Sequence, residues 1–180
     1  MEVFEAIKKR KSVRSYEPTP IPIEKLKRVL EAARMAPSAG NIQPWRFIVV
    51  LDSKKRSRIA KGCRYGHFLE ESPVVIVGCG DQNASRRWHA IDTCIAMENL
   101  VLAAVGEGLG TCWIGAFNEK AIRETLRIPD HLKVVALLAL GYSREKLNLS
   151  ATLAHFIRPR KKLERIAYLE EYGARFTGFP

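Results

Sequence analysis

The chain has 180 residues, of which 47% are apolar and 27% charged, and its formal net charge is +11 at pH 7. This composition is too apolar for a disordered chain, and the length suits one compact domain. A mean hydropathy of −0.13 and apolar runs shorter than the ~18–20 residues of a bilayer span argue against a membrane protein. The N-terminus has early glutamates and no apolar core of a signal peptide, so we expect a cytoplasmic location.

The first third of the chain predicts three helices and a strand. Apolar residues at helical spacing begin at Val3, and the helix is expected to end near Ser12. A second helix starts around Pro22 and carries one apolar stripe until Pro37 stops it. The turn formers of residues 37–44 precede an apolar run of strand length at 45–51 and a basic helix over about 53–61.

The next part alternates strands with helices. Residues 73–77 are apolar without alternation, which is typical of a strand covered on both faces. Residues 89–105 form a helix that is apolar nearly all round, so we place it in the middle of the molecule. A short strand over 111–115, a helix capped by Asn118 and a strand over 133–140 follow. These elements predict a layered sheet flanked by helices.

The positive charge is concentrated in three clusters, at residues 1–14, 52–64 and 158–165, whereas acidic residues outnumber basic ones over 65–157. A nucleic-acid groove would interleave cations with aromatic residues, and the clusters do not. The cluster of residues 54–61 is better explained as the solvated side of a surface helix whose apolar position is Ile59. We therefore expect no nucleic-acid partner.

Cysteine and histidine spacing predicts no metal site. The four cysteines are 15 or more positions apart, and the four histidines fit no metalloenzyme spacing. In a reducing compartment such cysteines act as small buried hydrophobes.

Three segments carry residues suited to binding. Arg10, Lys11, Ser12 and Arg14 could neutralise a phosphate, although an exposed basic helix end is an equally good explanation. The loop 37–44 presents amides that could recognise a flat heterocycle, or is ordinary turn chemistry. The glycines of 108–115 would let a ligand ring approach the backbone, or simply end a helix.

The order of these segments is more specific than any one of them. RKSVR, then PSAGNIQPWRFIVV, GLGTCWIG and PRKKLERIAYLEEYG resemble the FMN-dependent nitroreductase family over essentially the whole chain. The resemblance implies a single FMN-binding domain over 1–180 with a C-terminal arm from about 143. It also implies an α+β fold, a three-layer α-β-α sandwich with a central mixed or antiparallel sheet, in a domain-exchanged homodimer with FMN at the interface.

The same resemblance implies roles for individual residues. The phosphate and ribityl segment corresponds to Arg10, Lys11, Ser12 and Arg14, with Arg14 near the pyrimidine edge of the ring. The loop that reaches the flavin of the other subunit corresponds to Pro37, Ser38, Asn41 and Gln43. The backbone facing flavin N5 corresponds to Ile114 and Gly115, and a C-terminal phosphate clamp to Arg160 and Lys161, with Arg158 as a competitor. Arg64 and His67 fall where some members place polar groups at the N1/O2 edge, unless they belong to an exposed loop.

The implied activity is a ping-pong hydride transfer through flavin N5, from NAD(P)H to a nitroaromatic, quinone or activated alkene. No side-chain acid or base is then required. The alternatives are a flavin-binding protein without turnover and, with less support, a basic nucleic-acid-binding domain.

Overall fold

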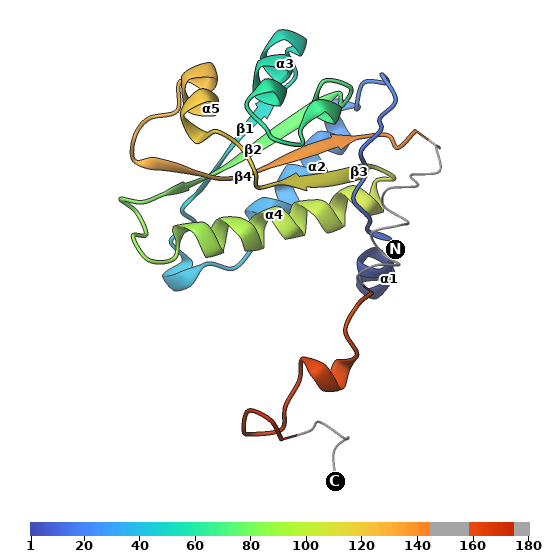
Figure 1. Ribbon diagram of the computed structural model, residues 1–180, viewed down its shortest axis with the longest axis vertical. Coiled ribbons are helices and arrows are strands. Elements are labelled where there is room, and N and C mark those ends of the chain that lie inside the picture. The colour runs from blue at the N-terminus through green and yellow to red at the C-terminus, as the bar shows by residue number, and fades with distance from the viewer. Residues whose placement is uncertain (145–158, 175–180) are drawn as a thin grey trace. The chain divides into compact units, whose positions relative to one another are not determined.

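The computed structural model describes residues 1–144 and 159–174. The chain divides into two units, Met1–Lys146 and Leu147–Pro180. The first unit contains, in chain order, α1 (Val3–Lys9), α2 (Ile23–Arg34), the 3₁₀ turn η1 (Ala39–Asn41), β1 (Trp45–Val50), α3 (Ser53–Lys61), η2 (His67–Leu69), β2 (Val74–Asp81), α4 (His89–Gly106), β3 (Gly110–Ile114), α5 (Glu119–Leu126) and β4 (Leu132–Gly141) (Figure 1).

The four strands form one antiparallel sheet in the order β1-β2-β4-β3. The inner strands β2 and β4 are buried along nearly their whole length, as their unbroken apolar sequences predict. A register shift between Gly78 and Cys79 interrupts their pairing. This arrangement confirms the predicted α+β sandwich.

Helices cover both faces of the sheet. On one face α3 and α5 pack on alternate strand residues that include Val75, Val77 and Ala139. On the other face α2 and α4 pack on the intervening residues, among them Ile76 and Leu138. The two faces therefore carry separate apolar cores, and the alternation of side chains along β2 and β4 assigns each residue to one of them.

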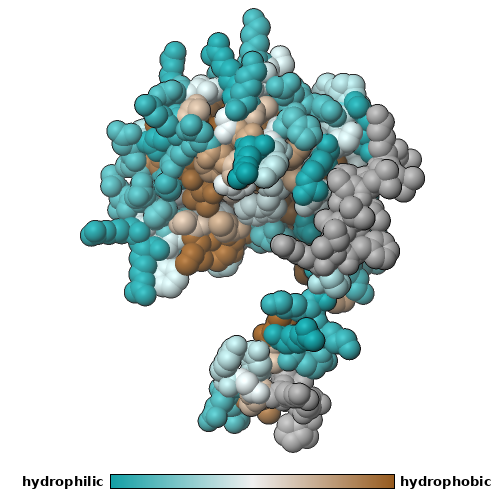
Figure 2. Space-filling view, viewed as in Figure 1, coloured by the Kyte–Doolittle hydropathy of each residue, from teal (hydrophilic) through white to brown (hydrophobic). Residues whose placement is uncertain are grey.

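The long helix α4 lies against the sheet, as predicted, but one of its sides stays uncovered in the first unit. Ala96, Met97 and Leu100 are fully buried, whereas Ile91 and Ile95 are exposed. Apolar side chains gather along the lower edge of this unit, where Figure 1 places α4 (Figure 2). By length and composition α4 could cross a membrane, yet its contacts with α2 and the sheet make it a core helix.

Two element ends differ from the sequence prediction for identifiable reasons. The strand expected to stop at Val77 continues to Asp81, because Gly78 and Gly80 keep their places in the ladder. The first helix ends at Lys9 rather than near Ser12, because Ser12 instead pairs with Thr111 on β3.

The described part of the second unit, residues 159–174, contains the 3₁₀ turn η3 (Leu163–Arg165). The rings of Tyr168 and Tyr172 lie 4.7 Å apart, centroid to centroid. Ser143 and Arg144, at the start of the predicted arm, belong to the first unit and pair with Tyr16 and Ser15.

The close approach of β2 to α4 gives a stability prediction. A Cβ at Gly80 would lie 2.9 Å from the carbonyl oxygen of His89, a backbone atom that cannot move aside alone. Gly80→Ala should therefore lower the free energy of unfolding by about 1–3 kcal/mol. Gly106→Ala is the control, since its Cβ meets nothing within 4 Å, and it should be neutral or stabilise by up to about 1 kcal/mol. Urea unfolding of both variants measures the difference; equal effects would contradict it.

Candidate functional site

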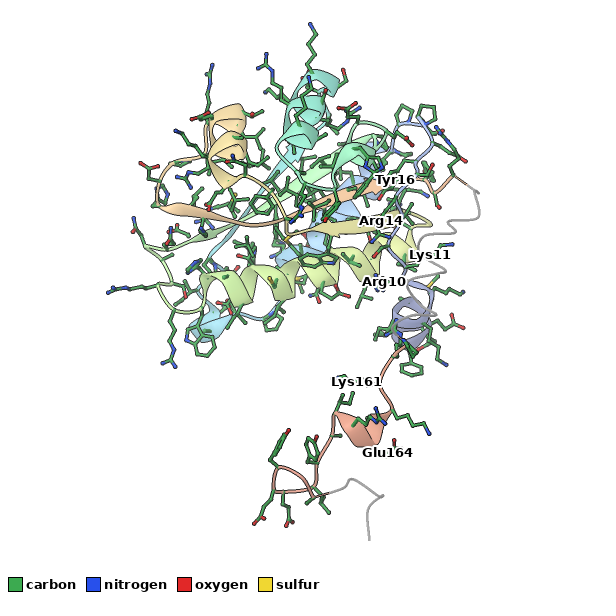
Figure 3. The ribbon with its side chains drawn as sticks, in the orientation of Figure 1. Arg10, Lys11, Arg14, Tyr16, Lys161 and Glu164 are labelled. Carbon is green, nitrogen blue, oxygen red and sulfur yellow. The ribbon has the colours of Figure 1, made fainter. Side chains whose placement is uncertain are left out.

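The chain after α1 forms an extra edge beside β3. Ser12 makes a parallel bridge with Thr111, and the Val13 N–H donates to the Thr111 carbonyl at 2.8 Å. Further along, Tyr16 bridges to Ser143 in the antiparallel sense. Backbone pairing to β3 and to the chain after β4 thus fixes the segment that carries the predicted phosphate ligands. Figure 3 shows this segment rising from α1 along the edge of the unit.

The cations of this segment are available to a ligand. Lys11 and Arg14 are exposed and Arg10 is half-buried. Over residues 1–144 and 159–174, none of the three lies within 4.0 Å of a carboxylate oxygen, whereas several other arginines and lysines do. Three cations within five residues, with no carboxylate partner among the described residues, could neutralise a dianion.

A carboxyl and an indole lie next to these cations. Burial raises the pKa of Glu98 on α4, while the positive charge of Arg10 and a hydrogen bond from Trp113 on β3 act in the opposite direction. The pKa of Glu98 thus responds to groups on two other segments, so α4, β3 and the cation segment meet here.

The far end of β3 is open. Gly115 follows the strand and is exposed, and a Cβ built on it would meet nothing within 4 Å. Its neighbour Ile114 is buried. A planar ligand could therefore approach the backbone at Gly115 without displacing a side chain.

The loop after α3 reaches this same end of β3. The Arg64 N–H donates to the Ala116 carbonyl at 3.0 Å, and Cys63 bridges to Phe117. The Arg64 side chain is exposed, with its guanidinium 5.4 Å from the centroid of the Tyr65 ring. His67 is exposed on η2. The structure thus brings the backbone of Arg64 beside Ile114 and Gly115, a proximity that sequence spacing left open.

The loop with Pro37, Ser38, Asn41 and Gln43 is organised by its own hydrogen bonds. Ser38 Oγ accepts from the Gln43 N–H at 2.9 Å, and the Gln43 side-chain amide donates to the Asn41 carbonyl at 3.1 Å. Gly40, Asn41 and Gln43 all have positive φ, between 54° and 57°. Such a tightly turned loop holds its exposed amides in fixed directions.

This loop is attached to the beginning of α4. The Ala39 N–H donates to the buried carboxylate of Asp92, with N–O distances of 3.3 and 3.4 Å. Asp92 precedes Glu98 by six residues, or about 9 Å of helix. Within the first unit the loop and the cation segment therefore lie at different positions along α4 (Figure 1), and one chain does not bring them together.

The predicted C-terminal clamp lies in the second unit. Arg160 and Lys161 are described and exposed, and their part in the site stays a prediction. Arg158 lies outside the described residues.

Sequence reasoning missed the buried residues behind the cation segment. Tyr16 is fully buried, and its hydroxyl donates to the Val13 carbonyl at 2.7 Å. Burial raises the pKa of the Cys112 thiol, with the charge of Arg14 and a hydrogen bond from Ser12 acting against it. Glu98 was a detectable signal, because it is one of two carboxylates in a largely apolar helix, but its partners on β3 and after α1 could not be inferred from spacing.

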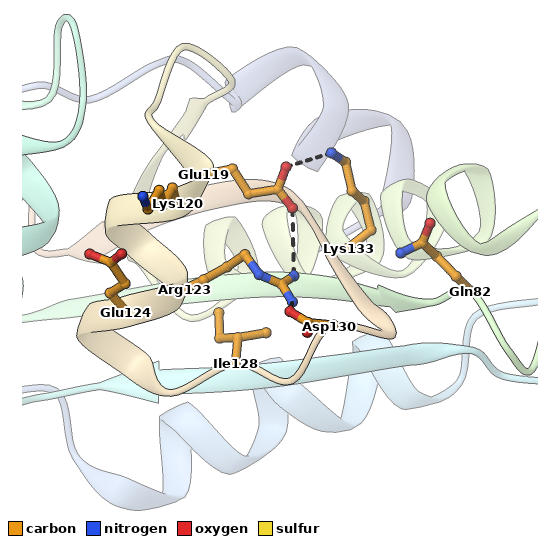
Figure 4. A pocket seen from close by; sticks show the side chains of 8 residues that line it. All are labelled: Gln82, Glu119, Lys120, Arg123, Glu124, Ile128, Asp130 and Lys133. Atoms are coloured by element: carbon orange, nitrogen blue, oxygen red, sulfur yellow. Dashed lines mark hydrogen bonds and ion pairs between the residues drawn. The ribbon is translucent and has the colours of Figure 1, made fainter.

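A surface hollow of about 660 Å³ lies elsewhere, between α5 and β4 (Figure 4). Four of the six charged residues that line it pair with one another: Arg123 bonds to Asp130 at 2.8 Å, and Glu119 pairs with Lys133. The hollow therefore offers a ligand few free charges. Within residues 1–144 and 159–174, no group of three or more His, Cys, Asp or Glu could hold a metal ion.

Comparisons with known proteins agree with this geometry. A model of the nitroreductase family matches residues 7–66 and 60–142. A protein of Archaeoglobus fulgidus described as a putative NADH dehydrogenase/NAD(P)H nitroreductase is 36% identical over 152 residues, covering 81% of this chain and 87% of that protein.

Solved structures show the same fold. A nitroreductase family protein from Clostridium novyi is 38% identical, with a TM-score of 0.77 over 98% of this chain and 97% of that one. An FMN-dependent nitroreductase from Clostridium difficile is 29% identical, with a TM-score of 0.76 over 98% of this chain and 99% of that one. Fold and relatives together define the class of protein, an oxidoreductase. More particularly, the chain belongs to the nitroreductase family.

Proposed function

We propose that the protein is an FMN-dependent oxidoreductase that takes hydride from NAD(P)H and passes it, in a ping-pong cycle, to an electron-poor acceptor such as a nitroaromatic, quinone or activated alkene. The observation that carries this proposal is the backbone pairing of the cation segment with β3, the strand that ends at Ile114 immediately before Gly115. FMN and NAD(P)H are also named in the descriptions of the relatives.

The residues present fit FMN. Its phosphate is a dianion, for which Arg10, Lys11 and Ser12 supply cations and a hydroxyl. Ser12 lies beside Thr111, and Gly115 follows four residues later, about 13 Å along an extended strand. This distance lies within the length of an extended phosphoribityl chain and its ring. The open backbone at Gly115 would accept the ring plane.

When bound, FMN supplies the hydride chemistry at N5. The chain would orient the ring, with the backbone of Ile114 and Gly115 on the side of N5. Arg14 would supply a positive charge at the N1/O2 edge, where it would stabilise the reduced ring. Arg64, with His67, lies on the loop that could add polar contacts at that edge. No side chain of the site is assigned a proton-transfer role.

We assign the uncovered side of α4 to a homodimer interface. Ile91 and Ile95 on α4, and Phe4 and Ile7 on α1, are exposed apolar residues on two helices that contact each other. A second copy would cover them. It would also bring its loop, with Pro37, Ser38, Asn41 and Gln43, to the flavin, while Arg160 and Lys161 would add cations at a phosphate. We place the dimer in the cytoplasm.

The purified protein tests the proposal directly. We expect a flavin absorbance spectrum and oxidation of NAD(P)H that depends on an added acceptor. A yellow protein without turnover would support a flavin-binding role instead. A colourless protein that binds duplex or single-stranded nucleic acid, with strong salt dependence, would overturn the assignment.

The role of Arg14 predicts a kinetic defect. Arg14→Ala should slow flavin reduction by NAD(P)H about 30- to 1000-fold, equivalent to about 2–4 kcal/mol of lost electrostatic stabilisation. FMN retention should fall much less. Stopped-flow absorbance measures reduction, with Arg58→Ala on the exposed side of α3 as the control. A variant reduced as fast as wild type would remove this role.

The dimer assignment predicts a change of mass. Ile91→Glu should halve the apparent mass in sedimentation equilibrium and weaken FMN binding, because a carboxylate cannot be buried unpaired in an apolar interface. Leu51→Glu is a matched control: Leu51 is 57% exposed and Ile91 51% exposed, but Leu51 follows β1 and lies away from α4. Equal masses for the two variants would exclude α4 from the interface.

A further inference from the structure

We propose that Tyr16, together with the cross-strand glycine pair Gly110 and Gly141, positions the cation segment for the flavin phosphate. Neither Tyr16 nor the two glycines touches the phosphate in this proposal; they act through Val13, the residue between the phosphate cations and Arg14. The inference rests on the proposed FMN site and adds to it the part of the fold that sets its phosphate affinity.

Val13 is held over the first residue of β3. A Cβ on Gly110 would lie 2.6 Å from Val13 Cγ2 and 3.0 Å from Val13 Cβ. Gly110 does not have positive φ, so its backbone conformation does not require glycine and the close contact does. The side chain of Val13 is 5% exposed. The side chain of Val13 therefore packs into the space that a side chain at Gly110 would occupy.

Tyr16 shares the corresponding space on the neighbouring strand with Pro73. A Cβ on Gly141 would lie 2.5 Å from Pro73 Cδ and 2.9 Å from Tyr16 Cδ1. The ring of Tyr16 is fully buried and lies 6.5 Å, centroid to centroid, from the ring of Phe68. Gly141, like Gly110, has no positive φ. Close packing again accounts for the glycine.

The two glycines face each other in the sheet. Gly110 and Gly141 are register partners on β3 and β4, so together they leave one gap across two strands. Val13 and Tyr16 enter this gap from the same segment, and Pro73 packs beside Tyr16 at Gly141. Packing into the space above two paired glycines restrains the segment both along the sheet edge and across the strands.

The hydroxyl of Tyr16 completes the arrangement. It donates to the Val13 carbonyl at 2.7 Å and closes the turn from Val13 to Tyr16 inside the core. Burial, followed by the neighbouring Cys112 thiol, raises the pKa of this phenol, and the charge of Arg14 only partly opposes them. The hydroxyl therefore remains a donor throughout the physiological pH range.

Buried and exposed side chains are interspersed along this segment. Val13 and Tyr16 are buried, whereas Lys11 and Arg14 on either side of Val13 are exposed. Fixing Val13 thus fixes the backbone from which the flanking cations extend. Preorganised cations bind a phosphate better than mobile ones, because less conformational entropy is lost on binding.

The test of positioning is the affinity for FMN divided by the affinity for riboflavin, since riboflavin lacks the phosphate. A lower ratio means that the phosphate contributes less to binding. The full-length chain, freed of flavin, is titrated with each compound, and quenching of flavin fluorescence gives the two Kd values. Tyr16→Phe keeps the ring and removes the hydroxyl. We expect its Kd for FMN to rise about five- to tenfold, the effect of one hydrogen bond, with less than twofold change for riboflavin.

A second pair of variants tests the packing of Val13 against Gly110. Gly110→Ala should displace Val13 and raise the Kd for FMN about tenfold or more. Val13→Ala in the same chain removes Cγ2, the atom nearest the added Cβ, and should restore the Kd to within about threefold of wild type. If Gly110→Ala simply unfolded the edge of the sheet, Val13→Ala would not be expected to restore the Kd for FMN.

Two controls separate positioning from loss of stability and from failure of the proposed site. Val134→Ala removes apolar atoms from the same core cluster near the opposite end of β4, and should lower stability without changing the FMN to riboflavin ratio. Arg10→Ala should lower the ratio directly.

The outcomes are distinct. A ratio lowered by Arg10→Ala but unchanged by Tyr16→Phe and Gly110→Ala overturns this inference alone. A ratio lowered equally by Val134→Ala also overturns it, since affinity would then follow stability. An unchanged ratio in Arg10→Ala overturns the phosphate assignment and this inference with it.

Discussion

The pairing of residues 12–16 with β3 and with the chain after β4 connects the fold of this protein to its site. The bridge from Ser12 to Thr111 joins the N-terminal segment to β3, and the bridge from Tyr16 to Ser143 joins it to the chain after β4. Without these contacts, the cations after α1 would extend from a free helix end. With them, the cations share one rigid frame with the open backbone at Gly115.

The same constraint explains an otherwise unfavourable charge distribution. Three cations within five residues repel one another, and residues 1–144 and 159–174 supply no carboxylate within 4.0 Å to neutralise them. The pKa of Glu98, whose carboxyl interacts with the charge of Arg10, is itself raised by burial. Native structures retain such unfavourable arrangements at functional sites, where a ligand compensates for them. A dianion is the ligand that best relieves this repulsion.

Local patterns predicted the elements well. The basic helix over 53–61 has the predicted bounds, with Ile59 buried, and Asn118 caps α5 by accepting from the Ala121 N–H. Both depend on residues within one or two turns of each other. The end of β2 was predicted too early because glycine disfavours strands; in the fold, Gly78 instead admits Met97 of α4.

Contacts between distant segments limited what could be predicted of the site. The sequence shows that Arg10, Lys11 and Arg14 are close together, but only the fold shows that Ser12 pairs with Thr111. Likewise, the proximity of Arg64 to Gly115 depends on a hydrogen bond to Ala116. Tyr16 gave no signal at all, because a lone tyrosine after a basic run has no pattern that marks it as buried. Patterns within a segment depend on neighbouring residues, whereas these contacts depend on how segments distant in the sequence pair in the folded sheet.

The loop 37–43 and the cation segment lie at different positions along α4, so one chain alone does not bring them together. Asp92 holds Ala39 at the beginning of α4, while Trp113 and Arg10 lie near Glu98, farther along the same helix. On α4, Ile91 next to Asp92 and Ile95 between Asp92 and Glu98 are both exposed, although a polar surface would be expected of a monomer. One chain therefore carries the loop and the cation segment at different positions along α4, whose exposed side forms an apolar stripe. A two-fold axis at that stripe would bury the apolar residues and place each loop against the other copy's cations, so the same contact would complete both the core and the site.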